Sequence, residues 1–393
     1  MKQKLIFVTE ALWIGGIESA LVNLLNALDY EKYEVTCLVL RASLEMAPRI
    51  TPKCRLLVAD REGIHSFKEA YRYSRLYHLT EESTSPSRLH RSLMWTVLAV
   101  KWVENRLYIR YLRRQLREEA FDTCVIYSDT AAETAVRAVN AKRFLLFYHH
   151  GAMRRVYHDG MGYRKAETII TVSEGTADML KAFRPRYAHK VKSIPNLIDI
   201  PRVLEMAKAS PEYRFPAEGF HVVTCGRLSE AKGIDLAIKA CRILLDRGHE
   251  DLHWWVLGGG PEEGKLGSLI FKNNLEDRFH LLGMQENPYP FMAAADLYVQ
   301  PSRFESYGMS IAEAVCLGKA VVSTETDGAK AFINHGENGL LCAAEPEAIA
   351  HGVEYLRTHG EAVKKYVEYG KKNGLEEENA ANLEALHRLF AGE

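Results

Sequence analysis

A predicted strand at residues 297–299 leads into Pro301-Ser302-Arg303-Phe304-Glu305-Ser306-Tyr307-Gly308-Met309-Ser310-Ile311-Ala312-Glu313, which opens a predicted helix. This order of strand, turn and helix is typical of a parallel α/β sheet, in which ligands bind at the carboxyl ends of the strands. Glu305 falls in the turn, and Glu313 falls about one and a half turns into the helix. We therefore expect both carboxylates on the ligand side of the sheet, where they can accept hydrogen bonds from hydroxyl groups.

The start of this predicted helix is a candidate anion site. The amides of Tyr307, Gly308 and Met309 fall there, and unpaired N–H groups with a partial positive charge favour a diphosphate. Gly308 has no side chain, so the backbone can approach a ligand closely. The alternative for the two glutamates is an ordinary solvated helix start.

A second charged loop follows the predicted strand at residues 221–225. Its sequence is Gly226-Arg227-Leu228-Ser229-Glu230-Ala231-Lys232-Gly233. Arg227 offers a planar fork of donors and Lys232 a mobile point charge, a pair spaced to bind one diphosphate. Such cations neutralise the charge that develops on a departing phosphate. Each charge alone could be an ordinary surface residue, but two charged loops that both follow strands favour a shared site.

Strand-like runs alternate with helical stretches along the whole chain, which is the βαβ rhythm of parallel sheets. The strands predicted in the first half are residues 4–9, 33–40, 54–58, 123–127, 144–148 and 168–172. Those predicted in the second half are residues 221–225, 253–257, 279–282, 297–299 and 320–323. The sequence therefore predicts an α/β protein with two sheets.

Length and composition indicate a globular protein of two domains. A chain of 393 residues exceeds one ordinary domain, and 47% hydrophobic with 26% charged residues is an ordinary globular composition. The longest apolar stretch, residues 92–103, is interrupted by Lys101 and is too short for the ~20 residues that a spanning helix needs. Residues 1–16 lack the pattern of a secretory signal, and the seven cysteines are scattered without a C-x-x-C pair. We expect a cytoplasmic protein without a disulfide framework or a zinc site.

Charge is distributed unevenly along the chain. Residues 1–200 contain 31 Lys and Arg against 22 Asp and Glu, whereas residues 201–393 contain 20 against 29. A basic half favours an anionic partner such as a membrane surface or a phosphorylated acceptor. Attraction between the two halves explains the asymmetry equally well.

Residues 88–117 concentrate the positive charge. They contain eight Lys and Arg against one acid, Glu104, and they also contain Trp95, Trp102, Tyr108 and Tyr111. Basic and aromatic residues on one amphipathic helix can lie against anionic lipid. The alternative is a solvated helix whose aromatic side chains pack inward. No recognisable nucleic-acid-binding module surrounds the run, so we expect no nucleic acid partner.

The two charged loops resemble the signature of glycosyltransferase family 4, also called glycosyl transferases group 1. The resemblance implies a retaining glycosyltransferase of the GT-B fold, in which two Rossmann-like domains face each other across a cleft, similar to bacterial capsule and exopolysaccharide glycosyltransferases. Further matches in family order are Gly15-Gly16, Pro195-Asn196-Leu197-Ile198-Asp199, Gly258-Gly259-Gly260-Pro261-Glu262, residues 296–302 and Asn338-Gly339-Leu340-Leu341. The second half of the chain matches closely, whereas residues 60–120 match nothing in the family.

The resemblance implies roles for individual residues. Arg227 and Lys232 would bind the donor pyrophosphate, Glu305 the transferred sugar and Glu313 the ribose. His150, which a glycine follows, matches the histidine in the family's cleft, whereas His149 has a structural interpretation. The implied catalytic residues are Glu305, His150, Arg227 and Lys232. The implied donor-binding residues are Gly15, Gly16, Asn196, Gly226, Arg227, Lys232, Met284, Glu305, Tyr307, Gly308, Met309 and Glu313.

The resemblance also implies the domain limits. Residues 1–199 would form the acceptor domain and residues 200–375 the donor domain, and a last helix at residues 376–393 would pack back on the first domain. Four prolines within residues 195–216 support a connection near residue 200. A charged run at residues 375–390 reads as a helix, with Gly392 as its stop.

The family implies sugar transfer that retains the anomeric configuration. No Asp-x-Asp sequence occurs, so we expect neither a metal on the diphosphate nor any other cofactor. The expected partners are a nucleotide-sugar donor and a carbohydrate or lipid-linked acceptor, with residues 88–117 touching the inner face of the cytoplasmic membrane. The alternatives are a nucleotide-sugar hydrolase or epimerase of the same fold, and a non-catalytic GT-B interaction protein. A hydrolase would consume donor without acceptor, and a non-catalytic protein would have lost its donor residues.

Overall fold

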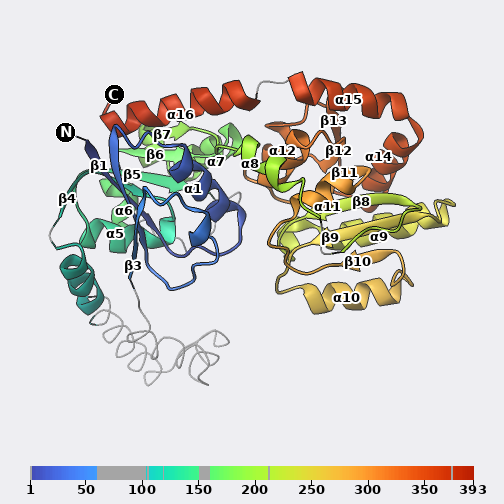
Figure 1. Ribbon diagram of the computed structural model, residues 1–393, viewed down its shortest axis with the longest axis horizontal. Coiled ribbons are helices and arrows are strands. Elements are labelled where there is room, and N and C mark those ends of the chain that lie inside the picture. Colours follow the sequence, from blue (N-terminus) through green and yellow to red (C-terminus); the bar gives the residue numbers. More distant parts are fainter. Residues whose placement is uncertain are drawn as a thin grey trace. The chain divides into compact units, whose positions relative to one another are not determined.

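Two parallel β-sheets form the framework of the protein (Figure 1). The computed structural model describes residues 2–59, 103, 106–117, 119–149, 160–210, 213–372 and 375–393. The first sheet has the strand order β3-β2-β1-β4-β5-β6-β7, and the second has the order β10-β9-β8-β11-β12-β13. The predicted alternation of strands and helices around two sheets is confirmed.

The strands of the first sheet are β1 Gln3–Thr9, β2 Tyr33–Val39, β3 Arg55–Val58, β4 Ala120–Ile126, β5 Asn140–Tyr148, β6 Thr168–Thr171 and β7 Val191–Ser193. Those of the second are β8 Phe220–Cys225, β9 Leu252–Leu257, β10 Phe279–Leu281, β11 Leu297–Gln300, β12 Val321–Thr324 and β13 Gly339–Cys342. The α-helices are α1 Gly16–Ala27, α5 Ala132–Ala138, α6 Met161–Lys165, α7 Glu174–Phe183, α8 Ile200–Met206, α9 Ile234–Asp246, α10 Glu263–Lys272, α11 Tyr289–Ala294, α12 Met309–Cys316, α13 Asp327–Lys330, α14 Pro346–Thr358, α15 Gly360–Lys372 and α16 Leu375–Ala391. No helix in these described ranges is both long and apolar enough to cross a membrane.

Each predicted strand is present, and two further strands lie at sheet edges. β7 and β13 end their sheets, and each is short, at three and four residues. The exposed Lys192 and the initial Gly339 interrupt the apolar pattern that reveals the central strands. Edge strands are covered less completely than central ones, so their sequences carry a weaker hydrophobic signal.

Two adjacent tryptophans show how the second sheet is built. Successive side chains of a strand point to opposite faces, and Trp254 and Trp255 of β9 belong to different hydrophobic clusters on the two faces. Both rings are almost completely buried, at 0% and 1% exposure. The Trp254 Nε1 donates to Thr224 Oγ1 at 3.0 Å, so its one polar atom is paired. Both faces of this sheet are therefore covered, as expected for parallel strands.

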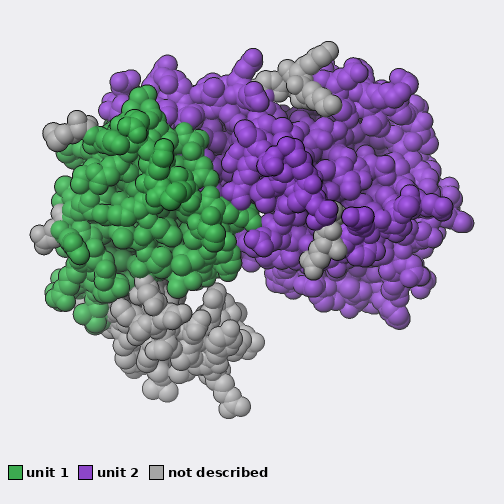
Figure 2. Space-filling view, viewed as in Figure 1, with its two compact units in different colours: residues 1–13, 25–148, 154–170 green, residues 14–24, 149–153, 171–393 purple. Residues whose placement is uncertain are grey.

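The chain divides into two compact units (Figure 2). Unit 1 comprises residues 1–13, 25–148 and 154–170, and unit 2 comprises residues 14–24, 149–153 and 171–393. The two sheets separate between Ser193 and Phe220, the stretch that contains the predicted boundary. Because unit 2 also includes residues 14–24 and 171–199, the domain limits 1–199 and 200–375 stay a prediction.

Within unit 2, the last helix, α16, is hydrogen-bonded to the backbone of Ile198 through Asn379. Asn379 accepts a hydrogen bond from the Ile198 backbone N at 3.0 Å and donates to the Ile198 O at 2.7 Å. Gly392 follows the helix with a φ of 93°, and its N–H donates to the Arg388 O, as predicted for the residue that stops it. The return of this helix to the first domain stays a prediction.

Part of the basic segment at residues 88–117 is described. Residues 106–115 are helical. Tyr108 is fully buried and donates from its hydroxyl to the Leu40 O at 3.2 Å, so this aromatic ring packs inward. Arg110, Arg114 and Arg117 are exposed. Trp95 and Trp102 lie outside the described residues.

Two histidines of neighbouring strands, His253 of β9 and His280 of β10, form a hydrogen-bonded chain with Arg278 that is complete only when both imidazoles are neutral. The Arg278 Nη1 lies 3.0 Å from the His253 Nε2, and the His253 Nδ1 lies 3.3 Å from the His280 Nε2. Because arginine only donates, the His253 Nε2 accepts, and its Nδ1 carries the proton that reaches His280. Burial, and next the charge of the neighbouring His253, lower the pKa of His280 to about 4.

We expect the free energy of unfolding to fall as the pH decreases from about 6.5 to 4. In this window the unfolded chain binds a proton at residue 280 more readily than the folded protein, so acid favours unfolding. Urea denaturation at pH 7, 5.5 and 4.5 measures the effect. His280→Asn should flatten the pH dependence, and an equally steep dependence in that variant would contradict the assignment.

Candidate functional site

The loop after β8 presents Arg227 from a rigid backbone. The Gly226 N–H donates to the Leu257 O at 2.9 Å, and the Leu228 N–H donates to the Gly259 O at 3.0 Å. Arg227 lies between these two bonds and is exposed, and its side chain makes no hydrogen bond or ion pair with the described residues. Its guanidinium is therefore available to an anionic ligand.

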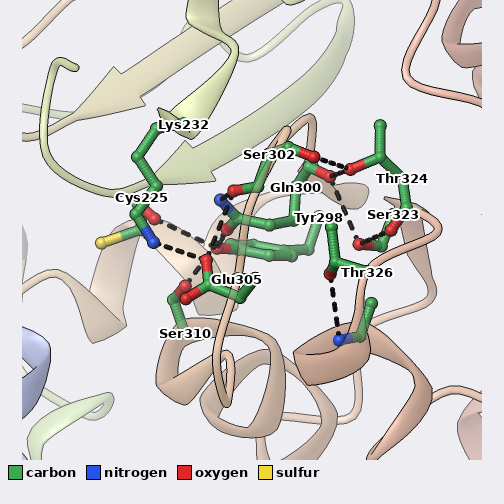
Figure 3. A network of polar contacts seen from close by, with 11 residues as sticks. Cys225, Lys232, Tyr298, Gln300, Ser302, Glu305, Ser310, Ser323, Thr324 and Thr326 are labelled. Atoms are coloured by element: carbon green, nitrogen blue, oxygen red, sulfur yellow. Dashed lines mark hydrogen bonds and ion pairs between the residues drawn. The ribbon is translucent and has the colours of Figure 1, made fainter. Parts of the chain in front are cut away.

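Lys232 and Glu305 meet at the carboxyl edge of the second sheet (Figure 3). Lys232 ends the short 3₁₀ helix Glu230–Lys232 that follows Arg227. Its Nζ donates to the Glu305 Oε2 at 2.5 Å, and the two side chains are 22% and 12% exposed. The structure thus joins the lysine of one predicted loop to the glutamate of the other.

The loops after β8 and β11 are also held together through their backbones. Gly233 has a φ of 63°, and a Cβ there would lie 2.0 Å from the Pro301 O. The Arg303 N–H donates to the Ala231 O at 2.8 Å. The Arg303 guanidinium binds both carboxylate oxygens of Asp235 at 2.7 Å, which lowers the pKa of Asp235. The two charged loops therefore form one structural element.

A buried chain of polar side chains reaches Glu305 from inside the sheet (Figure 3). Tyr298 donates to the Gln300 Oε1 at 2.6 Å, and Ser310 donates to the same oxygen at 3.1 Å. The Gln300 Nε2 donates to the Ser302 Oγ at 2.8 Å, and that hydroxyl donates to the Glu305 Oε2 at 3.3 Å. Gln300 and Ser302 are completely buried, so Glu305 is held from its protein side.

The start of α12 lies where the sequence predicts it. Gly308 precedes the helix in the left-handed conformation, at φ 84° and ψ 51°. Tyr307 is buried, and its hydroxyl donates to the Asn196 O at 2.7 Å. A Cβ on Gly328 would lie 2.6 Å from the Tyr307 backbone C, so α13 packs tightly behind this turn. The amides at the start of α12 are thereby held in place.

Glu313 lies inside α12 and is only 9% exposed. Its Oε1 accepts a hydrogen bond from the Tyr289 hydroxyl of α11 at 3.0 Å. Burial, and next the charge of Glu313, raise the pKa of Tyr289, so the phenol stays protonated and donates. The second glutamate of the predicted site is therefore oriented by a tyrosine.

The remaining predicted residues occupy several positions. Gly16 begins α1, and a Cβ there would lie 3.9 Å from the Met309 Cγ, within unit 2. Gly15 accepts the Ser19 N–H at its backbone O, at 2.9 Å. Met284 is 56% exposed and approaches Gly259, where a Cβ would lie 3.7 Å from its Cε.

Asn196 and the two histidines complete the comparison with the predicted site. The Asn196 Oδ1 is buried and has no hydrogen-bond partner among the described residues. His149 is 8% exposed, as suits a structural residue. His150, the predicted catalytic histidine, lies outside the described residues.

Sequence reasoning missed the residues that orient the two glutamates. Gln300, Ser302 and Tyr289 were not predicted site residues. One signal was present for Gln300, because a polar residue ends the otherwise apolar run of β11. A polar group that is completely buried requires partners. Tyr289 is 24 residues from Glu313, and nothing in the local pattern connects them.

Among the residues that the structure describes, no group of three or more His, Cys, Asp or Glu is placed to hold a metal ion.

Comparisons with known proteins identify relatives of both halves of the chain. Residues 14–202 match the family model Glycosyltransferase Family 4, and residues 205–373 match Glycosyl transferases group 1. The lipopolysaccharide core biosynthesis glycosyltransferase LpsE of Rhizobium meliloti is 29% identical over 195 residues, which is 49% of this chain and 55% of that protein. N-acetylgalactosamine-N,N'-diacetylbacillosaminyl-diphospho-undecaprenol 4-alpha-N-acetylgalactosaminyltransferase of Campylobacter jejuni is 29% identical over 186 residues, or 47% of this chain and 49% of that protein. The chain spans about half the length of the curated relatives it matches.

The solved structures show the fold. HepE from Anabaena, solved in complex with UDP and glucose, superposes with a TM-score of 0.71 at 17% identity, covering 98% of this chain and 99% of that one. At this identity the likeness concerns the fold alone. The two Rossmann-like sheets are those of the GT-B fold that the sequence predicted.

Proposed function

Because the chain belongs to glycosyltransferase family 4, with the group 1 domain in its second half, we propose that it transfers a sugar from a nucleotide-diphosphate donor to a hydroxyl acceptor. One observation carries the proposal. The loops after β8 and β11 bring an exposed arginine, a lysine and a glutamate to one sheet edge, beside the start of α12. Cationic side chains and helix N-terminal amides bind a diphosphate, and a carboxylate accepts hydrogen bonds from sugar hydroxyls.

Each part of the site has one task in this proposal. Arg227, Lys232 and the amides at the start of α12 bind the diphosphate. Glu305 accepts a hydrogen bond from the transferred sugar, and Glu313 accepts one from the ribose. Gly15 and Gly16 let the backbone approach the donor. His150 contacts the donor sugar or steers the acceptor.

The proposed reaction retains the anomeric configuration. The bond between the anomeric carbon and the phosphate oxygen breaks, and the acceptor oxygen forms the new bond on the same face. The acceptor proton passes to an oxygen of the departing phosphate. As the family resemblance implies, Glu305 in this proposal binds a remote hydroxyl of the sugar and does not serve as the covalent nucleophile. The cations stabilise the leaving diphosphate without a metal ion or other cofactor.

The proposed pathway is the synthesis of cell-surface polysaccharide or glycolipid. LpsE is named for lipopolysaccharide core biosynthesis, and the Campylobacter relative is named for an acceptor on diphospho-undecaprenol. These names support a carbohydrate or lipid-linked acceptor for this chain. Such an acceptor would be used in the cytoplasm, at the inner face of the membrane.

A donor screen tests the proposal. Purified protein is incubated with UDP-, GDP-, ADP- and CDP-sugars in the presence of a chelator, and nucleotide binding and release are followed with and without a lipid extract. Acceptor-dependent release from one donor, absent in Arg227→Ala, would support a metal-free transferase. Release that ignores the acceptor would favour a hydrolase or epimerase. Absence of binding to every donor would favour a non-catalytic protein.

Tyr289→Phe should raise the KM for the donor about fivefold and leave kcat nearly unchanged. The substitution removes one hydrogen bond to Glu313, which is worth about 1 kcal/mol, and Glu313 binds the ribose in both ground and transition states. Steady-state kinetics with varied donor measures both constants. Tyr213→Phe is the matched control, because Tyr213 is 47% exposed and its ring packs on Trp255. A fall in kcat at constant KM would contradict the role of Tyr289.

A second proposal concerns the membrane. The described part of the basic segment exposes Arg110, Arg114 and Arg117, together with Val103 and Leu107, which are 48% and 52% exposed. Arginines attract anionic headgroups, and neighbouring aliphatic side chains can enter the interface. The described residues thus support a contact made by arginine and aliphatic side chains.

We expect the protein to float with anionic liposomes at low salt. Charge reversal by Arg110→Glu with Arg114→Glu should weaken this binding at least about tenfold, since each arginine near an anionic surface contributes ~1 kcal/mol. Lys239→Glu with Lys272→Glu, two exposed lysines of α9 and α10, is the charge-matched control. Flotation that is equal in the two double variants would count against this surface.

A further inference from the structure

The hydroxyl of Ser302 has one proton, and its neighbours determine where that proton goes. The ionised Glu305 carboxylate can only accept, so Ser302 must donate to its Oε2. Ser302 then needs a donor on its other side, which the Gln300 Nε2 supplies at 2.8 Å. A reversed Gln300 amide would place two acceptors against each other. Each hydrogen bond from Gln300 through Ser302 is therefore donated in the direction of Glu305.

The amide oxygen of Gln300 accepts hydrogen bonds, as this direction of donation toward Glu305 requires. Its Oε1 accepts from Tyr298 at 2.6 Å and from Ser310 at 3.1 Å. Burial and nearby Cys225 raise the pKa of Tyr298, so the phenol keeps its proton. Gln300 is 0% exposed, so its amide does not contact bulk solvent. Each polar atom of its amide is thus assigned a partner by the buried groups around it.

The two oxygens of Glu305 consequently differ. The Oε2 accepts from both Lys232 and Ser302. The Oε1 has no hydrogen-bond partner among the described residues, and the side chain retains 12% exposure. One carboxylate oxygen is therefore used by the protein, and the other is open to a ligand.

We propose that Gln300 is a positioning residue. It makes Ser302 donate to the Glu305 Oε2 (Figure 3), and so leaves the Oε1 available to one hydroxyl or N–H group of the transferred sugar. This inference rests on the proposed sugar transfer. Gln300 acts only through Ser302, and misplacement of a substrate by about 1 Å costs on the order of a hundredfold in rate.

Hydrogen bonds from Thr324 and Ser323 hold the backbone of this loop, so the positioning role of the Gln300 side chain can be tested separately from the fold of the loop. Thr324 donates the one proton of its Oγ1 to the Ser302 O at 2.5 Å, and the Gln300 O lies 3.3 Å from the same hydroxyl. These contacts hold the backbone independently of the side chains of Gln300 and Ser302. Ser323 also donates to the Gln300 O, at 3.3 Å, but contacts neither Ser302 nor Glu305 through its hydroxyl. Ser323 therefore offers a matched buried control.

The experiment is a double-variant cycle with Gln300→Met and Ser302→Ala. Each single variant should lower kcat at least about tenfold, as loss of a hydrogen bond to a charged group predicts, while the affinity for the nucleoside diphosphate alone stays unchanged. The double variant should lose no more than the single ones, because both interrupt the same chain. Ser323→Ala should destabilise the protein and keep its kcat.

Three outcomes would overturn the proposal: full kcat in Gln300→Met, losses that multiply in the double variant, or an equal loss in Ser323→Ala. If the wild-type protein transfers no sugar, the proposed function fails, and crystal structures decide this inference separately. A Gln300→Met structure that keeps the Ser302–Glu305 contact would overturn it, whereas a Ser302 hydroxyl turned away would support it.

Discussion

Glu305→Ala is expected to lower kcat by about a hundredfold, the cost of a misplaced substrate, and to leave a folded protein. The substitution removes the acceptor that the sugar uses. It also frees Lys232, whose Nζ lies 2.5 Å from the carboxylate, and leaves the Ser302 hydroxyl without its acceptor. The lysine can then pair with phosphate in the ground state, which does not replace the contact to the sugar.

Sugar transfer and thermal unfolding should be measured together for this variant. Glu263→Ala is the control, because Glu263 is an exposed glutamate in the first turn of α10. Its kcat should equal that of the wild-type protein. If Glu305→Ala keeps the wild-type kcat, Glu305 has no role in the reaction. If its melting temperature falls strongly, the loss of kcat reflects unfolding and not a lost contact with the sugar.

Gly233→Ala should destabilise the protein by roughly 4 kcal/mol or more, the range reserved for severe backbone conflicts. A Cβ at this position would lie 2.0 Å from the Pro301 O, and the residue has a φ of 63°. The obstructing atom belongs to the backbone, so no rotamer change relieves the conflict. The loop that carries Lys232 would have to move away from the loop that carries Glu305.

Gly248→Ala separates this clash from the strain of a positive φ. Gly248 has a φ of 89°, but nothing lies within 4 Å of a Cβ placed there. Its substitution should cost only about 1 kcal/mol, the penalty of the left-handed conformation. Urea denaturation of both variants provides the comparison. Equal losses would show that conformation, and not the contact with Pro301, makes Gly233 necessary.

The sequence was sufficient to predict the central strands and the charged loops, because both leave local signals. The run Leu5 to Val8 is completely buried in β1, and a buried parallel strand reads as a continuous apolar stretch. Arg227, Lys232, Glu305 and Glu313 lie within short recognisable motifs. Their placement at one sheet edge follows from the rule that parallel strands end together.

Contacts between distant positions could not be predicted in the same way. Arg303 binds Asp235 across 68 residues, and Tyr289 reaches Glu313 across 24. Such pairs depend on how two elements pack, which no local periodicity encodes. The inward packing of Tyr108 in the basic segment is a further example, since its partner is the backbone of Leu40. The catalytic role of His150 stays a prediction.

The close backbone contacts of the glycines have a consequence for protein engineering. A Cβ on Gly258 would lie 2.0 Å from the Gly226 O, and one on Gly260 would lie 2.3 Å from the Leu228 O. Gly233 fits the Pro301 O equally tightly. These contacts pack three loops into one structural unit, namely residues 226–233, 258–260 and 301–305. A chimera that exchanges one of these loops for that of a relative, to change the donor, should fail to assemble unless all three are exchanged together.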